Sequence, residues 1–223
     1  EAYSVCARQN SFKDGVMVVA SAGNTARAFA KVCSENKIHV LICIPKDCAK
    51  AMWFSQEIDS CVKLIACEAG GDYFDAIHLS NIACEIEGFF PEGGAKNIAR
   101  RDGMGTTVLS AVTTIGRIPD YYFQATGSGT GAIAAWEANI RLIEDGRWGK
   151  NKMKLILSQN IPFVPIKEAW DLSSREILPM DHNLARKQVE EIMAKVLSNR
   201  KPPYGLKGGL FDAMTESGGE VIA

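Results

Sequence analysis

The sequence offers little that would bind a nucleic acid or enter a membrane. Its 25 basic and 26 acidic side chains nearly cancel and are scattered along the chain, so no basic run is present to grip a phosphate backbone or an anionic lipid surface. No apolar run approaches the roughly 18 residues that a membrane-spanning helix needs. We therefore expect a soluble protein that acts on small molecules and binds neither nucleic acid nor membrane.

Histidine is scarce and the cysteines form no sequence motif, which argues against a metal site. Only three histidines occur, none beside a pair of cysteines, and no Cys-x-x-Cys spacing is present. The seven cysteines are an odd number and mostly fall within apolar stretches, which predicts reduced thiols in a cytoplasm. They are Cys6, Cys33, Cys43, Cys48, Cys61, Cys67 and Cys84. We expect no metal ion and a cytoplasmic location.

The start of the chain lacks two further features. It has no charged segment followed by an apolar segment and a small-residue cleavage site, so no secretory signal is predicted. The first residue is Glu1 rather than methionine, and we expect the sequence to be part of a longer chain.

One unit is repeated along the chain: a short apolar run, a turn with Gly, Asn or Pro, and a helical pattern with apolar residues three and four apart. Continuous apolar strands joined by crossover helices predict an α/β fold with a parallel sheet that is covered on both faces. The predicted strands span residues 16–20, 40–44, 62–66, 121–125 and 154–159, and the predicted helices span 26–36, 73–87, 132–145 and 182–198.

The segment 89–105 separates two groups of these units. It is rich in glycine and charge, contains Pro91, and shows little strand or helix periodicity before Thr106. We place a domain boundary in this segment, with one domain at residues 1–96 and another at 97–223.

The strongest chemical signal is the turn Thr126-Gly-Ser-Gly-Thr-Gly131, which lies between an apolar strand and a helix. Glycine lets the backbone turn tightly and approach an anion, whose charge is met by free N–H groups and the positive end of the helix dipole. The turn is not a P-loop, because no Lys-Ser/Thr pair follows it, and it lacks the third glycine of a dinucleotide fingerprint. It predicts a bound phosphate or a phosphate-bearing cofactor, with a purely structural turn as the alternative.

A second turn, Ser21-Ala-Gly-Asn-Thr25, also lies between an apolar strand and a helix. Its N–H groups, two hydroxyls and amide suit a carboxylate or a phenolate oxygen. Serine, asparagine and threonine are also the residues that a helix start prefers, so simple helix capping is the alternative.

In this order and about 100 residues apart, the two turns resemble those of the fold-type II pyridoxal-phosphate enzymes, the family of threonine synthase, cysteine synthase and the tryptophan synthase β chain. The resemblance implies two parallel-sheet α/β domains, incomplete in this chain, with residues 1–96 in the smaller, mobile domain and 97–223 in the larger, cofactor-binding domain. It implies pyridoxal 5′-phosphate as the cofactor, bound by Asn24, Gly127, Ser128, Gly129, Thr130 and Gly131, and a substrate bound by Ser21, Ala22, Gly23 and Thr25.

A third segment, Pro91-Glu-Gly-Gly-Ala-Lys-Asn97 and the residues after it, resembles the stretch of threonine synthase in which an Asn and an Arg three residues later bind the substrate's phosphate. By that resemblance Asn97 and Arg100 bind substrate, and Arg101 and Arg27 are weaker candidates for the same anion pocket. A guanidinium suits a phosphate or a sulfonate because it donates two parallel charge-assisted hydrogen bonds. Solvated surface arginines are the alternative.

Together with Gln159-Asn-Ile-Pro-Phe-Val-Pro165, these segments look most like the cysteate synthase branch of the family, over nearly the whole chain. Ala26 and Ala132 stand where relatives often carry glycine, and each adds one methyl group. The resemblance implies a homo-oligomer that converts O-phospho-L-serine and sulfite to L-cysteate and phosphate by β-replacement, on a route toward coenzyme M. The alternatives are a threonine synthase acting on O-phosphohomoserine and a non-catalytic fragment that binds a phosphate-bearing ligand.

Enzymes of this family need a Schiff-base lysine that holds the cofactor and moves the substrate's α-proton. Lys13, in Ser11-Phe-Lys-Asp14, resembles the family's lysine motif. However, only seven residues separate Lys13 from Ser21, where the family has a whole helix and a strand. We therefore expect the lysine upstream of Glu1, with Lys13 as the less favoured candidate, and no catalytic residue within this chain.

Overall fold

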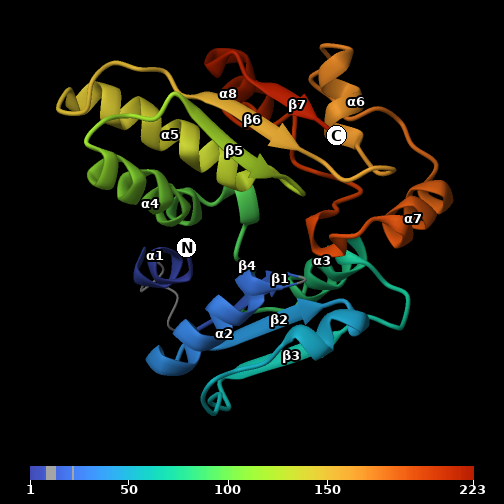
Figure 1. The fold of residues 1–223 in the computed structure, drawn as a ribbon. Coiled ribbons are helices and arrows are strands. Elements are labelled where there is room, and N and C mark those ends of the chain that lie inside the picture. The colour runs from blue at the N-terminus through green and yellow to red at the C-terminus, as the bar shows by residue number, and fades with distance from the viewer. Residues whose placement is uncertain (9–13, 22) are drawn as a thin grey trace. The chain divides into compact units, whose positions relative to one another are not determined.

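The structure is a computed structural model that describes residues 1–8, 14–21 and 23–223. The chain divides into two compact units, Glu1–Gly103 and Met104–Ala223, each with a sheet of its own (Figure 1). The division falls inside α4 (Ile98–Ile115). This helix begins directly after the domain boundary that we placed between residues 96 and 97.

The first unit is built on a parallel sheet with the strand order β3-β2-β1-β4. Its strands are β1 (Val16–Ala20), β2 (Val40–Ile44), β3 (Val62–Ala66) and β4 (Phe89–Pro91). Apolar and β-branched residues dominate the two inner strands, as expected where a parallel sheet is buried on both faces. Every adjacent pair is parallel, so the turns that follow β1 and β4 leave from the same edge of the sheet.

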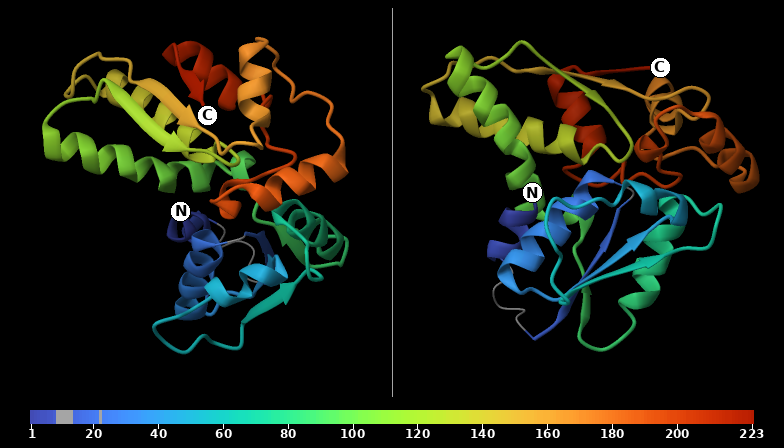
Figure 2. Two further views of the ribbon diagram at one scale, coloured as in Figure 1. Left: turned by 45° about the vertical axis from the view of Figure 1, so that its right-hand side comes forward. Right: turned by 60° about the horizontal axis from the view of Figure 1, so that its bottom comes forward.

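Helices cover both faces of this sheet (Figure 2). The helices α1 (Ala2–Arg8) and α2 (Asn24–Asn36) pack on the face that receives Met17 and Val19, whereas α3 (Tyr73–Ala83) packs on the face that receives Val18. Successive residues of a strand point to opposite faces, which is why neighbours in β1 enter different cores. Two short 3-10 helices, η2 (Lys46–Ala51) and η3 (Gly94–Lys96), lie in the connections.

The second unit has a parallel sheet with the order β5-β6-β7. Its strands are β5 (Tyr121–Ala125), β6 (Lys154–Ser158) and β7 (Glu220–Ile222). The largely buried helix α5 (Thr130–Asp145) makes the crossover from β5 to β6. The long connection from β6 to β7 contains α6 (Pro165–Asp171), α7 (His182–Glu191), η4 (Lys195–Leu197) and α8 (Leu210–Ser217).

The predicted α/β class, with parallel sheets and crossover helices, is confirmed. Several local predictions are wrong, among them the helix predicted over 73–87, which ends at Ala83. The segment 89–105 is not irregular, because it contains β4 and the start of α4. Gly103 and Gly105 interrupted the helical pattern there, and Gly103 is needed because a Cβ would lie 2.7 Å from Cα of Glu1. The helix predicted to end at Ser198 ends at Glu191, and α8 and β7 were not predicted.

Within the described ranges, no helix is both long and apolar enough to cross a membrane. The same ranges contain no cluster of three or more His, Cys, Asp or Glu side chains that could hold a metal ion. All seven cysteines are free thiols. Burial raises the pKa of Cys43 to about 12, so this thiol stays protonated at neutral pH.

Candidate active site

The glycine-rich turn after β5 forms an anion cradle in the second unit. The backbone N–H of Thr126 donates to the Ser158 carbonyl (2.8 Å), which fixes the start of the turn to β6. Gly129 has a φ of 80° and directly precedes the 16-residue helix α5. Among the described residues, the backbone N–H groups of 127–132 bind no acceptor. These donors are therefore free at the positive end of the helix dipole.

The turn needs its glycines because protein atoms pack against them. A Cβ at Gly127 would lie 3.1 Å from the backbone carbonyl carbon of Leu197, and a Cβ at Gly129 would collide with the side chain of Leu210. Gly131 is likewise packed against a neighbouring side chain. With one side packed and its N–H groups free, the turn has the donors that an oxyanion such as phosphate requires.

Two hydroxyls complete the cradle. Ser128 Oγ and Thr130 Oγ1 lie 3.1 Å apart, within hydrogen-bonding distance, and Thr130 is buried. Since a hydroxyl both donates and accepts, one of the pair can accept from the other and still donate its own proton to an oxyanion. The structure therefore brings the predicted cofactor-binding residues of this turn together.

The turn after β1 caps α2 with its serine. Ser21 is buried, and its Oγ accepts from the backbone N–H groups of Gly23 (3.3 Å) and Ala26 (3.2 Å). Ser21 thus satisfies an N–H group in the first turn of α2 in the manner of a cap, although the N-cap position itself is occupied by Gly23, which makes no side-chain cap. Of the other sequence-predicted residues, Ala22 and Lys13 lie outside the described residues.

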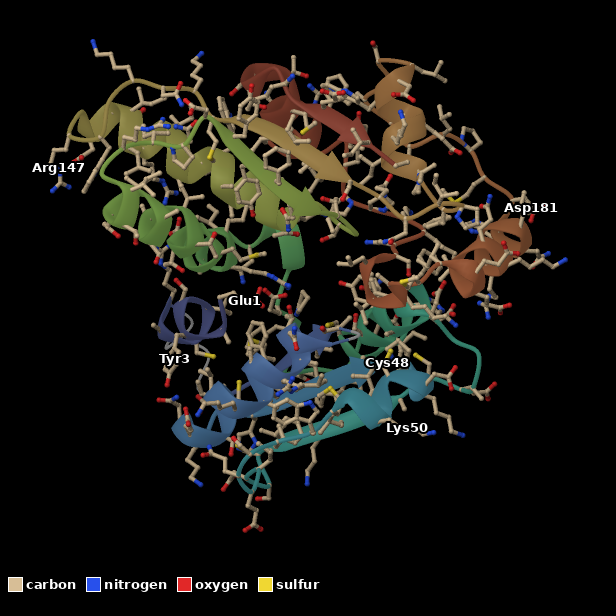
Figure 3. The ribbon with its side chains drawn as sticks, viewed as in Figure 1. Glu1, Tyr3, Cys48, Lys50, Arg147 and Asp181 are labelled. Carbon is tan, nitrogen blue, oxygen red and sulfur yellow. The ribbon has the colours of Figure 1, made fainter. Side chains whose placement is uncertain are left out.

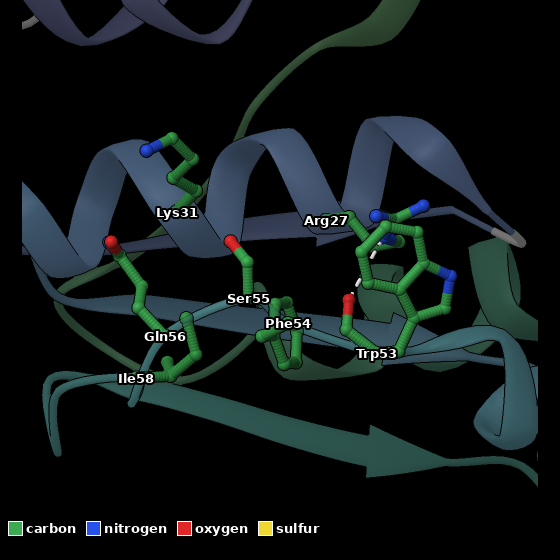
Figure 4. A pocket seen from close by; sticks show the side chains of 7 residues that line it. All are labelled: Arg27, Lys31, Trp53, Phe54, Ser55, Gln56 and Ile58. Carbon is green, nitrogen blue, oxygen red and sulfur yellow. Dashed lines mark hydrogen bonds between the residues drawn. The ribbon is translucent and has the colours of Figure 1, made fainter.

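Asn24 begins α2 with an exposed side chain whose oxygen is already bound. Its Oδ1 accepts from Nη1 of Arg27 (3.3 Å). Arg27 is held by Trp53, because its Nε donates to the Trp53 carbonyl (3.0 Å) and its guanidinium carbon lies 3.5 Å from the ring centroid (Figure 4). A pocket of about 60 Å³ between α2 and the segment 53–58 lies beside this pair. Arg27 thus contacts Asn24 and Trp53.

Arg100 lies at the centre of a buried ion cluster in the first unit. Its Nη1 donates to Oε2 of Glu92 (2.7 Å), and its Nε lies 3.0 Å from Oε2 of Glu1, which starts the chain beside α1 (Figure 3). Thr25 Oγ1 donates to Oε1 of Glu1 (2.8 Å) and accepts from Nη2 of Arg100 (3.5 Å). The side chain of Arg100 is 11% exposed, so it is not the solvated surface arginine of the alternative interpretation.

Asn97 fixes the backbone around Arg100. Its Nδ2 donates to the Glu92 carbonyl (2.6 Å), and its Oδ1 accepts from the backbone N–H of Arg100 (3.3 Å), which is the pattern of a helix N-cap at the start of α4. Arg101, a weaker candidate for the anion pocket, donates to a backbone carbonyl of η3 (2.6 Å). Thr25, Asn97 and Arg100 are therefore neighbours, although the turn and the helix are far apart in sequence.

The ion cluster contains more negative than positive charge. Burial acts against the charged guanidinium, but Glu92 and Glu1 keep the pKa of Arg100 above its ordinary value. Burial also raises the pKa of the Tyr73 hydroxyl, which Arg100 partly opposes. Glu92 Oε1 and Glu1 Oε2 are buried without a hydrogen-bond partner in the described chain. One guanidinium is thus shared between two carboxylates that it does not fully satisfy.

Sequence reasoning missed Glu92 and Glu1 as members of this cluster. The available signal for Glu92 was an acidic residue directly after a strand, the edge at which parallel α/β sheets place functional groups. Glu1 gave no signal, because its ion pair with Arg100 depends on tertiary packing.

The sequence profile described as "Pyridoxal-phosphate dependent enzyme" matches residues 1–221, which is nearly the whole chain. The chain belongs to this enzyme family. The family resemblance predicted from the two turns is therefore confirmed, and with it pyridoxal phosphate as the family's cofactor.

Several curated proteins share about 50% sequence identity with this chain. The cysteate synthase of Methanosarcina barkeri is 52% identical to it over 208 residues, and the aligned region covers 93% of this chain and 50% of the relative. The chain is 49% identical over 222 residues to the cysteate synthase of Methanocorpusculum labreanum, which covers 99% of this chain and 53% of the relative. The chain thus spans about half the length of the curated relatives it matches.

Solved structures of pyridoxal-phosphate dependent enzymes share the fold. A pyridoxal 5′-phosphate-dependent aspartate racemase superposes with a TM-score of 0.69 at 14% identity, over 99% of this chain and 63% of that chain. The O-acetyl serine sulfhydrylase isoform 3 of Entamoeba histolytica gives a TM-score of 0.60 at 14% identity, over 99% and 58% of the two chains. These likenesses confirm the predicted fold-type II architecture.

Replacing Gly129 with alanine is expected to weaken cofactor binding, because the new Cβ would collide with Leu210 and displace the N–H groups of the turn. Gly146→Ala is the matched control, since Gly146 caps the other end of α5 with a φ of 78° and open space around it. Backbone strain of about 1–3 kcal/mol is common to both variants. Titration of the full-length protein with pyridoxal phosphate should show a loss of about tenfold or more in affinity for Gly129→Ala alone. Equal losses of affinity in the two variants would contradict the proposal that this turn binds the phosphate of the cofactor.

Arg100→Met is expected to destabilise the full-length protein by about 3–5 kcal/mol, because it leaves buried carboxylates without their cation. Arg117→Met is the control, since Arg117 forms an exposed ion pair with Asp120, and its loss should cost about 0–1 kcal/mol. In a Glu92→Gln background the cost of Arg100→Met should fall. Urea denaturation measures the free energy of unfolding of each variant. If Arg100→Met lowers it no more than Arg117→Met does, the ion cluster contributes little to stability.

Proposed function

We propose that the full-length protein is a cysteate synthase, which replaces the phosphate of O-phospho-L-serine with sulfite. The observation that carries this proposal is the 52% identity over 208 residues to a curated cysteate synthase, with further relatives of the same name at similar identity. The geometry supports it with an anion cradle in one unit and a guanidinium beside the substrate turn in the other.

The glycine-rich turn would hold the cofactor through its phosphate. The free N–H groups of 127–132 and the hydroxyls of Ser128 and Thr130 are the donors for its oxygens. When bound, pyridoxal phosphate supplies an electron sink for the α-carbon of the amino acid. In the first unit, Nδ2 of Asn24 would donate to the ring oxygen, because Oδ1 is already bound to Arg27.

The substrate's carboxylate would bind the turn 21–25 through backbone donors. The N–H groups of Gly23 and Ala26 are taken by Ser21 Oγ. Those of Asn24 and Thr25 donate to no acceptor in the described chain, and they lie in the first turn of α2, where the helix dipole favours an anion. These two N–H groups are therefore the ones that we assign to the carboxylate.

Arg100 would meet the phosphate that leaves and the sulfite that enters. Its Nη1 and Nε face Glu92 and Glu1, whereas Nη2 has only the 3.5 Å contact with Thr25 among the described residues. Nε makes no hydrogen bond either, but it lies against the carboxylate of Glu1, so Nη2 is the donor that we assign to a further anion. That anion must compete with two carboxylates for the same guanidinium. Asn97 would contribute by fixing the start of α4, since both ends of its amide bind backbone groups.

Replacing phosphate by sulfite at the substrate's β-carbon needs no reactant other than O-phospho-L-serine and sulfite. The bond from Cβ to the phosphate oxygen breaks, and phosphate leaves with the electron pair. A lone pair on the sulfur of sulfite then forms the new Cβ–S bond. The α-proton that is removed before the first step returns after the second, so the products are L-cysteate and phosphate.

We also propose that residues 1–96 belong to a smaller, mobile domain and residues 97–223 to a larger, cofactor-binding domain of a cytoplasmic homo-oligomer that serves coenzyme M formation. In support, the substrate turn belongs to the first unit and the phosphate cradle to the second. The free thiols suit a reducing compartment.

The full-length protein, supplied with pyridoxal phosphate, should convert O-phospho-L-serine and sulfite to equal amounts of cysteate and phosphate. Phosphate release that does not depend on sulfite, or that yields no cysteate, would refute the proposal. O-phosphohomoserine with water is the parallel assay, and formation of threonine there would identify a threonine synthase. Cofactor binding with no turnover of either substrate would point to a non-catalytic protein that binds a phosphate-bearing ligand.

A further inference from the structure

We propose that Arg27, held in place by Trp53, is a positioning residue that turns the side-chain amide of Asn24 so that its NH₂ group faces the ring oxygen of the bound cofactor. The inference rests on the role of Asn24 in the proposed function and extends it to two residues that do not touch the cofactor. Arg27 acts through Asn24, and Trp53 acts through Arg27.

Trp53 fixes Arg27 from two directions. Its carbonyl accepts from Nε at 3.0 Å, and its ring lies against the guanidinium at 3.5 Å from the centroid (Figure 4). A planar guanidinium that is stacked and hydrogen-bonded at Nε has little freedom to rotate. Because Nη1 is part of the same rigid plane, its position next to Asn24 is set by Trp53. These two contacts with Arg27 also account for the position of Trp53, which is 60% exposed and lies between η2 and β3.

The chemistry of the guanidinium decides which way the amide of Asn24 points. A guanidinium has only donors, so the atom of Asn24 that faces Nη1 must be the carbonyl oxygen, Oδ1. The other half of the amide, Nδ2, only donates, and it has no acceptor among the described residues. If the amide of Asn24 were flipped by 180°, its oxygen would face the ring oxygen of the cofactor and repel it when that oxygen is ionised. Arg27 therefore selects the orientation that can bind that oxygen.

The charge of Arg27 adds to this orientation. A cation 3.3 Å from Oδ1 polarises the amide and strengthens the donation from Nδ2. The residues that line the pocket beside Arg27 include no acid that could draw the guanidinium away. The next cation along α2, Lys31, forms its own ion pair with Glu35 (2.6 Å). Among the described residues, Arg27 is the cation that hydrogen-bonds the amide of Asn24.

The absorbance spectrum of pyridoxal phosphate on the full-length protein, at one fixed pH, tests the inference, because it distinguishes an ionised ring hydroxyl from a neutral one. Arg27→Met should raise the ratio of neutral to ionised cofactor by about five- to tenfold, the equivalent of one hydrogen bond. Trp53→Ala, which loses the ring but keeps the backbone carbonyl, should shift the ratio in the same direction by less. Trp53→Phe, which keeps a ring over the guanidinium, should restore it.

Lys31→Met is the matched control, since Lys31 lines the same pocket one turn further along α2, and it should leave the spectrum unchanged. Asn24→Ala should shift the ratio at least as far as Arg27→Met, and adding Arg27→Met to it should change nothing more. If Asn24→Ala has no effect, the proposed role of Asn24 fails and this inference fails with it. If Asn24→Ala shifts the spectrum but neither Arg27→Met nor Trp53→Ala does, this inference alone is overturned.

Discussion

A single buried guanidinium holds the functional segments of the first unit in place. Arg100 links the start of α1 through Glu1, the turn 21–25 through Thr25 and the turn after β4 through Glu92. Removing a charge from water costs several kcal/mol unless the charge is paired and hydrogen-bonded. Withdrawal of Glu1 or Glu92 would remove one of the two carboxylates that pair with this buried guanidinium. Thr25 carries no charge, but its hydroxyl donates to Glu1 and accepts from Arg100, so the turn 21–25 is hydrogen-bonded to both members of the ion pair.

The strand order explains how residues so distant in sequence form one cluster. β4 pairs with β1 and not with β3, its neighbour in the chain. The backbone N–H of Glu92 continues this pairing by donating to the carbonyl of Val18 (2.9 Å). Both strands end at the same edge of the sheet, so the turn that carries Thr25 and the turn that carries Glu92 emerge side by side. Parallel α/β folds commonly place their sites at such carboxyl ends.

The sequence could predict features that depend on short stretches of chain. β1 and β2 are continuous apolar runs, and the two turns carry the residues that anion binding and helix starts require. The start of α4 could not be predicted, because Gly103 and Gly105 weaken the helical pattern, and the close approach of Glu1 that requires Gly103 cannot be read from the sequence. The partners of Arg100 follow only from the strand order. The orientation of Asn24 depends on Trp53, which lies in a segment without strand or helix periodicity.

The two proposed anion sites use different kinds of hydrogen-bond donor, and the difference suits the two phosphates of the proposed reaction. The cradle before α5 offers neutral, fixed backbone donors, with no acidic side chain among the residues of its turn. Such a site can retain the phosphate of a resident cofactor through every turnover. At Arg100, by contrast, an arriving phosphate would meet a guanidinium that already faces two carboxylates. Glu92 and Glu1 would repel the anion and pair with the guanidinium again when it departs, so the proposed site would favour release. A substrate phosphate has to be released in each cycle, whereas a cofactor phosphate has to stay.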